Sequence, residues 1–259
     1  MEPAPFRTLP GDPSPPARAF WVRADDGIRL RLAHWPAATG PDAGPAGTIL
    51  LFPGRTEYLE KYVEVGRELA AGGFHVLAAD WRGQGMSDRL QADRRPGHAI
   101  DFADFQRDVV ELVIAAQDLD LPQPWHLLAH SMGGAIGLGA LVNELPVASA
   151  VFSAPMWGIM ARPAKRLLAT GLSRVAGRLG RSGLPAIGTG GRGSFVLDCP
   201  FNDNLLTEDG ARWGRMVAEA AAWPDLTLGG ASYGWVGTAF AETQRLAAVP
   251  ASGLPDIPV

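Results

Sequence analysis

The sequence of 259 residues contains one cysteine, Cys199, which excludes an internal disulfide and a thiolate metal cluster. No run approaches the roughly 18 consecutive apolar residues of a membrane span. Residues 1–16 lack the basic start and apolar core of a signal peptide. The net charge of −4 gives no positive excess that would indicate a nucleic-acid partner. We therefore expect a soluble cytoplasmic protein, either free or peripheral to the inner face of the membrane.

The N-terminal part predicts a leader followed by a hairpin. Residues 1–17 are rich in proline and predict a disordered leader. A turn signal at residues 25–27 separates two stretches, 19–23 and 28–35, that we expect to pair as antiparallel strands. The alternation of apolar and arginine side chains over residues 28–32 predicts a half-buried strand.

Strands and helices then alternate along the chain. The expected strands are four apolar runs, at residues 48–52, 74–79, 125–129 and 147–152. The expected helices lie at residues 57–71, 102–117 and 132–141. This alternation predicts the α/β class, with a mostly parallel sheet and helices on both faces. In such sheets functional sites lie at the carboxyl ends of the strands.

The alternation stops near residue 155, which divides the chain. We assign residues 18–154 to the first part of the core and residues 155–247 to an inserted, mostly helical cap. Residues 248–259 are then a return to the core that stops at the next strand. Half of the eight tryptophans lie in the cap, which predicts an apolar lining there.

Residues 162–181 of the cap contain six basic residues and no acidic one. The apolar residues at 168, 172, 175 and 179 share one face of a helix, and arginines share the other. One interpretation is a basic amphipathic helix that meets an anionic lipid surface. The other is a cap helix with its apolar face packed and its arginines solvated.

The segment around Ser131 predicts a nucleophile elbow, because a buried strand is followed at once by a helix of small residues. The turn needs glycine or a close substitute two residues before and after the serine, and these places hold Ala129 and Gly133. The backbone N–H of Met132 would lie at a helix N-terminus, where it favours developing negative charge. An ordinary strand-to-helix turn that contains a serine is the alternative.

Acyl transfer by serine needs a second oxyanion donor, from the loop after strand 48–52. The best candidate is the N–H of Arg55, because Gly54 lets the backbone approach closely. A plain turn in which Thr56 caps the following helix is compatible with the same residues.

Three motifs together resemble the α/β-hydrolase fold, and more narrowly the monoglyceride lipase and bacterial lysophospholipase group. They are PGRTE at 53–57, DWRGQGMS at 80–87 and AHSMGG at 129–134. Four further segments, cap included, are similar to the bacterial lysophospholipase branch. They are Gly97-His98 with Asp101-Phe102, APMWG at 154–158, AIGTG at 186–190 and GGASYGWV at 229–236.

The resemblance implies a serine carboxyl-ester hydrolase that acts on monoacyl glycerolipids, foremost a lysophospholipase, without metal or organic cofactor. It implies Ser131 as the nucleophile and the backbone N–H groups of Arg55 and Met132 as oxyanion donors. The partner would be a lysophospholipid or monoglyceride, with peripheral membrane contact through the cap and no nucleic acid. The alternatives are a monoacylglycerol lipase, an acyltransferase of the same fold, and a non-catalytic binding protein.

The sequence departs from the family in its histidines. In this fold the triad runs serine, then Asp or Glu, then histidine, yet no histidine follows Ser131. We expect a C-terminally truncated sequence, with the triad acid and base beyond Val259 and the last strands and helix missing. A chain of 259 residues should then be nearly inactive and prone to self-association. His98 is expected to anchor a loop. The other histidines are His34, His75, His126 and His130.

Overall fold

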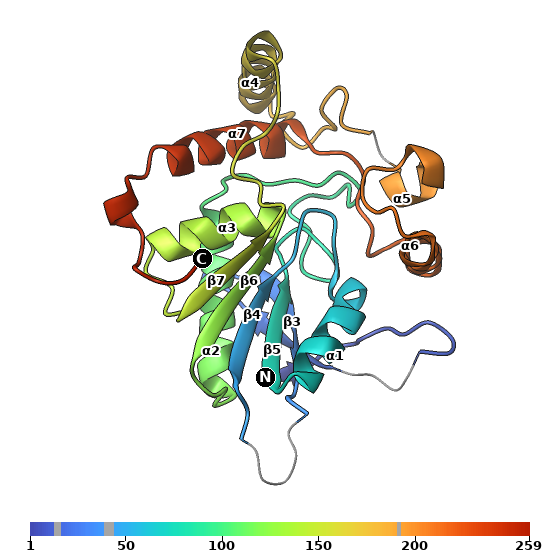
Figure 1. Ribbon diagram of the computed structural model, residues 1–259. Helices are drawn as coiled ribbons and strands as arrows, with labels where there is room; N and C mark the ends of the chain where they lie inside the picture. The colour runs from blue at the N-terminus through green and yellow to red at the C-terminus, as the bar shows by residue number, and fades with distance from the viewer. Residues whose placement is uncertain (13–16, 39–43, 191–192) are drawn as a thin grey trace.

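The computed structural model describes residues 1–12, 17–38, 44–190 and 193–259. Within these residues seven strands form one sheet, in the order β1-β2-β3-β5-β4-β6-β7 (Figure 1). The strands are β1 Glu2–Pro3, β2 Arg18–Arg23, β3 Arg29–Trp35, β4 Gly47–Phe52, β5 Phe74–Asp80, β6 Trp125–His130 and β7 Ser149–Ser153.

The sheet has an antiparallel part and a parallel part. Strands β2 and β3 pair as the expected antiparallel hairpin, and β3 also pairs antiparallel with β5. Strands β5, β4, β6 and β7 run parallel to one another. Every residue of β4 is buried, as expected for a central strand covered on both faces. The predicted α/β class and its mostly parallel core are therefore confirmed.

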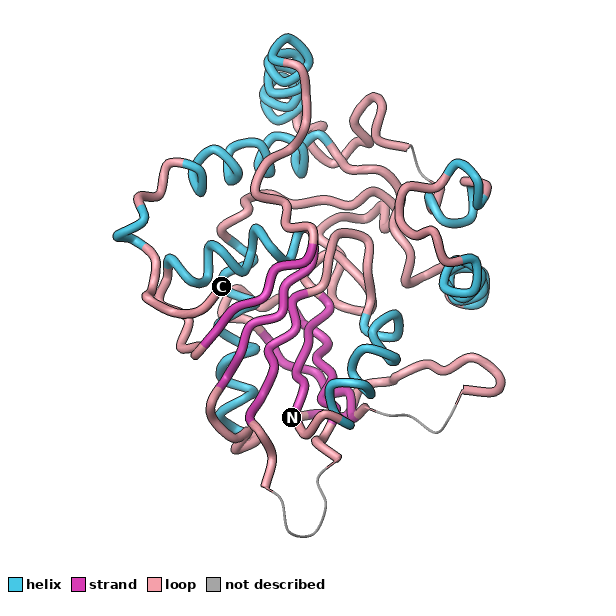
Figure 2. The backbone as a smooth tube through the Cα atoms, in the orientation of Figure 1, coloured by secondary structure: helices cyan, strands magenta, loops and turns pink. Residues whose placement is uncertain are grey.

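Helices lie on both faces of this sheet (Figure 2). The 3-10 turn η1 (Leu59–Tyr62) and helix α1 (Val63–Ala71) cover one face, where Leu51 belongs to their apolar core. Helices α2 (Asp104–Asp118) and α3 (Met132–Val142) cover the other, where Leu50 belongs to a second, larger core. Neighbouring residues of β4 thus serve opposite cores, because side chains alternate along a strand.

The residues assigned to the cap are mostly helical and lie beyond the carboxyl ends of the parallel strands (Figure 1). Helix α7 contacts α3 below it, and α4 packs on α7 from the side away from the sheet. No helix in the described ranges combines the length and apolar character that a bilayer crossing requires. The elements are α4 Pro163–Arg178, α5 Phe195–Asp198, η2 Phe201–Asp203, α6 Gly210–Ala222 and α7 Tyr233–Ala247, followed by η3 Ala251–Gly253.

The expectation of a disordered leader is wrong for residues 1–12. Strand β1 pairs with β2, with Pro3 opposite Phe20. The Arg7 side chain donates two hydrogen bonds of 2.7 Å to Asp225 of the cap. Proline is tolerated here because an edge strand leaves some backbone N–H groups unneeded. The rest of the predicted leader at 13–16 lies outside the described residues.

The half-buried interpretation of residues 28–32 is also wrong at one position. Arg31 is 0 % exposed, although the alternation placed it on the solvent side. Its guanidinium lies 2.7 Å from carboxylate oxygens of both Glu60 and Asp80. The buried charge is therefore paired, which a strand pattern alone does not reveal.

Candidate active site

The strand–turn–helix around Ser131 has the backbone of a nucleophile elbow. Strand β6 ends at His130 and α3 begins at Met132. Ser131 between them has φ 50° and ψ −116°, a strained conformation for a residue with a side chain. A Cβ on Gly133 would lie 2.1 Å from the carbonyl oxygen of Phe52, so this place requires glycine. The ordinary-turn alternative does not account for this strain.

Backbone hydrogen bonds hold the elbow in place. The Ser131 N–H donates to the Ser153 carbonyl at 3.1 Å, and the Met156 N–H donates to the Ser131 carbonyl at 2.8 Å. The serine residue itself is half-buried. Because Met132 is the first residue of α3, its N–H has no acceptor within the helix. The nucleophile candidate and one donor candidate thus adjoin each other.

The loop after β4 leaves one amide free. The Gly54 N–H donates to Glu57 Oε2 at 2.5 Å, and the Thr56 N–H donates to Gln84 Oε1 at 2.7 Å. In the described structure the Arg55 N–H between them makes no hydrogen bond. Thr56 has φ 65° and does not cap the helix, so that alternative is wrong. The free amide is the one that the sequence singled out.

Glu57 connects this loop to the elbow, a role that we did not predict. The carboxylate is buried and accepts hydrogen bonds from Gly54, Lys61 and Tyr62. Its Oε1 also lies 3.8 Å from His130 Nε2. Burial favours a raised pKa for Glu57, but the charges of Lys61 and His130 outweigh it and hold the pKa below its ordinary value.

A buried network supports the loop after β5. Asp80 accepts hydrogen bonds from the N–H groups of Leu59 and Met86, at 2.9 and 2.8 Å. Burial raises the pKa of Asp80, while Arg31 opposes that rise. The indole of Trp81 donates to the Pro53 carbonyl at 2.9 Å and so joins the ends of β5 and β4. An aspartate that closes an apolar strand is the sequence signal for such a support.

The side chain of Arg55 is a second feature that the sequence did not reveal. Its Nη2 donates to the Gly229 carbonyl at 2.9 Å, and its guanidinium lies 5.0 Å from the ring centre of Trp235. Its Nε is buried without a hydrogen bond, and no described carboxylate pairs with it. Burial lowers the pKa of Arg55 to about 10. An unpaired positive charge therefore lies between the loop after β4 and the cap.

None of the five histidines, all within the described ranges, hydrogen-bonds to the Ser131 hydroxyl. His98 Nδ1 lies 2.8 Å from Ser232 Oγ at the start of α7, which confirms its loop-anchoring role. His130 Nδ1 lies 3.1 Å from the Ser153 carbonyl oxygen. His34 and His75 pair with each other at 2.9 Å, and His126 pairs with a serine of β7. Within the described residues, no histidine is therefore hydrogen-bonded to the candidate nucleophile.

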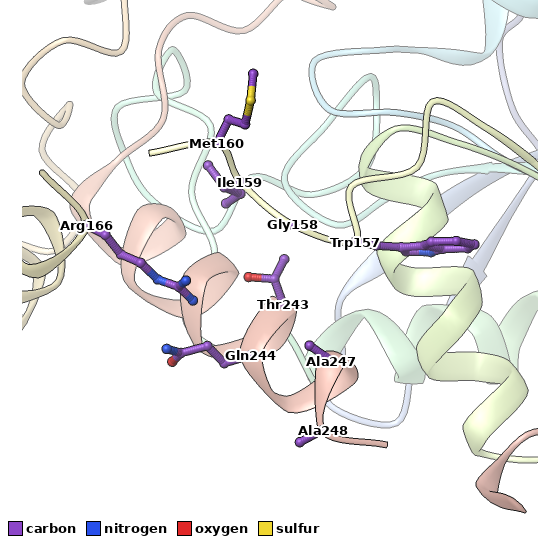
Figure 3. Close-up of a pocket in the computed structure, with 9 residues that line it drawn as sticks. All are labelled: Trp157, Gly158, Ile159, Met160, Arg166, Thr243, Gln244, Ala247 and Ala248. Carbon is purple, nitrogen blue, oxygen red and sulfur yellow. The ribbon is translucent and has the colours of Figure 1, made fainter. Parts of the chain in front are cut away.

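Among the described residues, cavities lie in the cap. One of about 500 Å³ is lined by residues 157–160 and by α7, with Arg166 of α4 extending toward it (Figure 3). The other, of about 420 Å³, lies between α4 and α7 and is lined by Arg174 among others. Ser131 lines neither cavity. Arginine and apolar groups together line the first, a combination that accommodates an amphiphile.

Comparison with known proteins places these features in a family. The family model described as serine aminopeptidase, S33, matches residues 43–252. Lysophospholipase L2 of Escherichia coli (strain K12) is 37 % identical over 196 residues, covering 73 % of this chain and 54 % of that protein. The probable lysophospholipase L2 of Haemophilus influenzae is 28 % identical over 221 residues, with 85 % and 67 % covered. The chain spans about half the length of the first of these relatives.

Solved structures are similar in fold. A monoglyceride lipase of Saccharomyces cerevisiae has a TM-score of 0.64 at 18 % identity, covering 93 % of this chain and 72 % of that one. A carboxyl esterase of Bacillus coagulans has a TM-score of 0.65 at 13 % identity, covering 92 % and 76 %. At these identities the likeness concerns the fold alone.

Proposed function

The chain belongs to the hydrolase family described as serine aminopeptidase, S33, and we propose that it is a serine carboxyl-ester hydrolase of the lysophospholipase type. Ser131 is the proposed nucleophile, and the backbone N–H groups of Arg55 and Met132 are the proposed oxyanion donors. The Ser131 hydroxyl oxygen would attack the ester carbonyl and lose its proton, and the acyl C–O bond would break so that the glycerol-bearing alcohol leaves with a proton. Water would then hydrolyse the acyl-enzyme to the free fatty acid and restore the serine hydroxyl. The strained backbone of Ser131 is the observation that carries the proposal.

The pairing of two free amides supports the chemistry. Each oxyanion donor contributes roughly 3 kcal/mol to lowering the barrier, provided that it is not already bonded in the resting protein. The Arg55 N–H meets this condition because its neighbours at 54 and 56 are engaged while it is not. The Met132 N–H meets the same condition because Met132 is the first residue of α3, where an N–H has no acceptor within the helix.

The Arg55 side chain favours a phosphate-bearing substrate over a neutral glyceride. A guanidinium with one backbone acceptor has unused donors that match phosphate oxygens. Ether-linked analogues, which cannot be hydrolysed, test this by calorimetry. Arg55→Gln keeps the backbone N–H and should weaken the ether lysophospholipid about 10-fold while leaving the ether monoglyceride unchanged. Arg166→Ala and Arg174→Ala serve as matched cap variants. Equal affinities throughout would remove the argument for phosphate.

The decisive experiment treats the protein made in its natural host with a fluorophosphonate and maps the adduct by mass spectrometry. We expect one adduct, on Ser131, and none in Ser131→Ala. A folded protein without an adduct would favour a non-catalytic protein that binds lipid. The acyltransferase alternative shares the acyl-enzyme and differs only in the acceptor.

Peripheral contact with a membrane is part of the same proposal. A monoacyl lipid partitions into bilayers, so an enzyme that takes it gains access at the bilayer surface. The apolar residues that line the cavity beside Arg166 support entry of the acyl chain from the cap side.

A further inference from the structure

Helix α4 turns its large apolar side chains away from the protein. Leu168, Leu172, Val175 and Leu179 are 62 %, 37 %, 52 % and 64 % exposed. At 3.6 residues per turn these four form one stripe along the helix. The interpretation of a cap helix with a packed apolar face is therefore wrong, and the stripe remains without a partner in the described structure.

Small residues make the contact with α7 instead. Ser173 and Ala176 are the buried residues of α4. A Cβ on Gly237 of α7 would lie 2.9 Å from Ser173 Cβ, which shows how closely the two helices approach. In a soluble protein an amphipathic helix packs its large apolar residues inward. Helix α4 has the reverse arrangement, so protein packing does not explain its leucines.

The charges around the stripe are of one sign. Arg174 and Arg178 flank it on one side, and Lys165 lies on the other. All three are exposed. Residues 162–181 contain six basic residues and no acidic one, in a chain whose net charge is −4. Positive charge thus gathers beside the exposed leucines rather than over the whole molecule.

We propose that this stripe of α4 docks on the surface of an anionic lipid bilayer. The leucines and valine would enter the boundary between head groups and acyl chains, while Lys165, Arg174 and Arg178 meet lipid phosphates. Helix α4 lies on the outermost side of the cap, away from the sheet (Figure 1), so a flat surface reaches it. A second copy of the chain is a poorer occupant, because two such helices would bring like charges together.

Vesicle co-sedimentation tests this without reference to catalysis. The intact protein should bind vesicles of phosphatidylglycerol and phosphatidylcholine more tightly than pure phosphatidylcholine vesicles, and salt should weaken the binding. The triple variant Leu168→Asn, Leu172→Asn, Leu179→Asn should lower partitioning at least about 10-fold. Arg174→Gln with Arg178→Gln should lower it about 5-fold per charge on anionic vesicles only.

Matched controls separate docking from general stickiness. Leu205→Asn with Leu206→Asn removes apolar groups that are 94 % and 56 % exposed elsewhere in the cap, and binding should not change. All variants alter exposed positions, and an unchanged melting temperature verifies their fold. Equal vesicle binding by the stripe variant and the native protein would overturn the proposal. So would sedimentation velocity showing that the stripe supports a dimer in the absence of vesicle binding. In the protein from its natural host, Ser131→Ala should lose the fluorophosphonate adduct and keep full vesicle binding, which separates docking from the proposed function.

Discussion

Gly133 lies where the first turn of α3 meets the end of β4. A methyl group there would sit 2.1 Å from the Phe52 oxygen and 2.6 Å from the Pro53 oxygen, both of them backbone atoms. Neither atom can move without shifting the loop after β4 that contains Arg55. We expect Gly133→Ala to lower the free energy of unfolding by at least about 2 kcal/mol, measured by urea denaturation.

Gly171 provides the matched control at the residue scale. It lies inside α4, and a Cβ there would meet no atom within 4 Å. Gly171→Ala should therefore stabilise the protein by about 0.5–1 kcal/mol, since alanine favours a helix and restricts the unfolded chain. If both alanine variants shifted stability alike, close backbone contact at the elbow would not be the cause.

Between elements, the contact of β3 with β5 contains a pair of histidines that should make stability depend on pH. Burial, with the nearby His75 and Arg18, lowers the pKa of His34 to about 4. His34 gains a proton near pH 6.5 in the unfolded chain but only near pH 4 in the folded protein. The contribution of His34 to stability is therefore fully present above pH 6.5 and is lost as the pH falls toward 4.

Denaturant unfolding at pH 7 and pH 5 measures this effect. His34 is partly exposed, so we expect a loss of about 1 kcal/mol rather than the full shift. His34→Gln, which cannot titrate, should show a smaller loss between the same two pH values. An identical loss in both proteins would mean that other groups govern the acid sensitivity.

At the scale of the elements, the sequence correctly predicted those features that depend only on residues close together in the chain. The apolar runs of β4, β5 and β6 and the small residues of α3 identify a parallel core and an elbow, because burial on both faces leaves only apolar or small side chains. The same reasoning selected Arg55 and Met132 by position. It failed where a partner distant in the sequence decides the outcome. Arg31 is buried because its guanidinium pairs with Glu60 and Asp80, and the alternation of residues along a strand does not predict such a pairing.

Helix α4 shows the same limit in the reverse case, because its apolar face is exposed where burial would be expected. Its period correctly predicted an apolar face, but a period does not say what that face contacts. The small residues Ser173 and Ala176 determined the packing, since they allow α7 to approach closely. The candidate site was thus predictable in its backbone atoms and not in the side chains that support it. Glu57, for instance, acts through Gly54 and His130, and only the folded chain brings these together.

In the whole molecule, the ends of three parallel strands converge on the proposed site. Strand β4 supplies the loop with Arg55, β6 supplies Ser131, and Trp81 after β5 hydrogen-bonds to the Pro53 carbonyl. The proposed ester hydrolysis also requires a base that takes the proton of the Ser131 hydroxyl. Within the described ranges all five histidines are engaged elsewhere or lack a hydrogen bond to that hydroxyl.

We therefore propose that the chain of 259 residues, produced by itself, turns over esters poorly. Loss of the base costs about as much as loss of the whole triad, on the order of 10⁶ in kcat, and leaves only the oxyanion donors and substrate binding. Hydrolysis of a short-chain nitrophenyl ester should stay close to the buffer rate, and Ser131→Ala should scarcely change it. The ether lysophospholipid should still bind, because the proposed contact of its phosphate with the Arg55 guanidinium does not require the catalytic base. A turnover near the roughly 10 s⁻¹ typical of enzymes, abolished by Ser131→Ala, would instead require that a group already present, such as His130, reorients to serve as base.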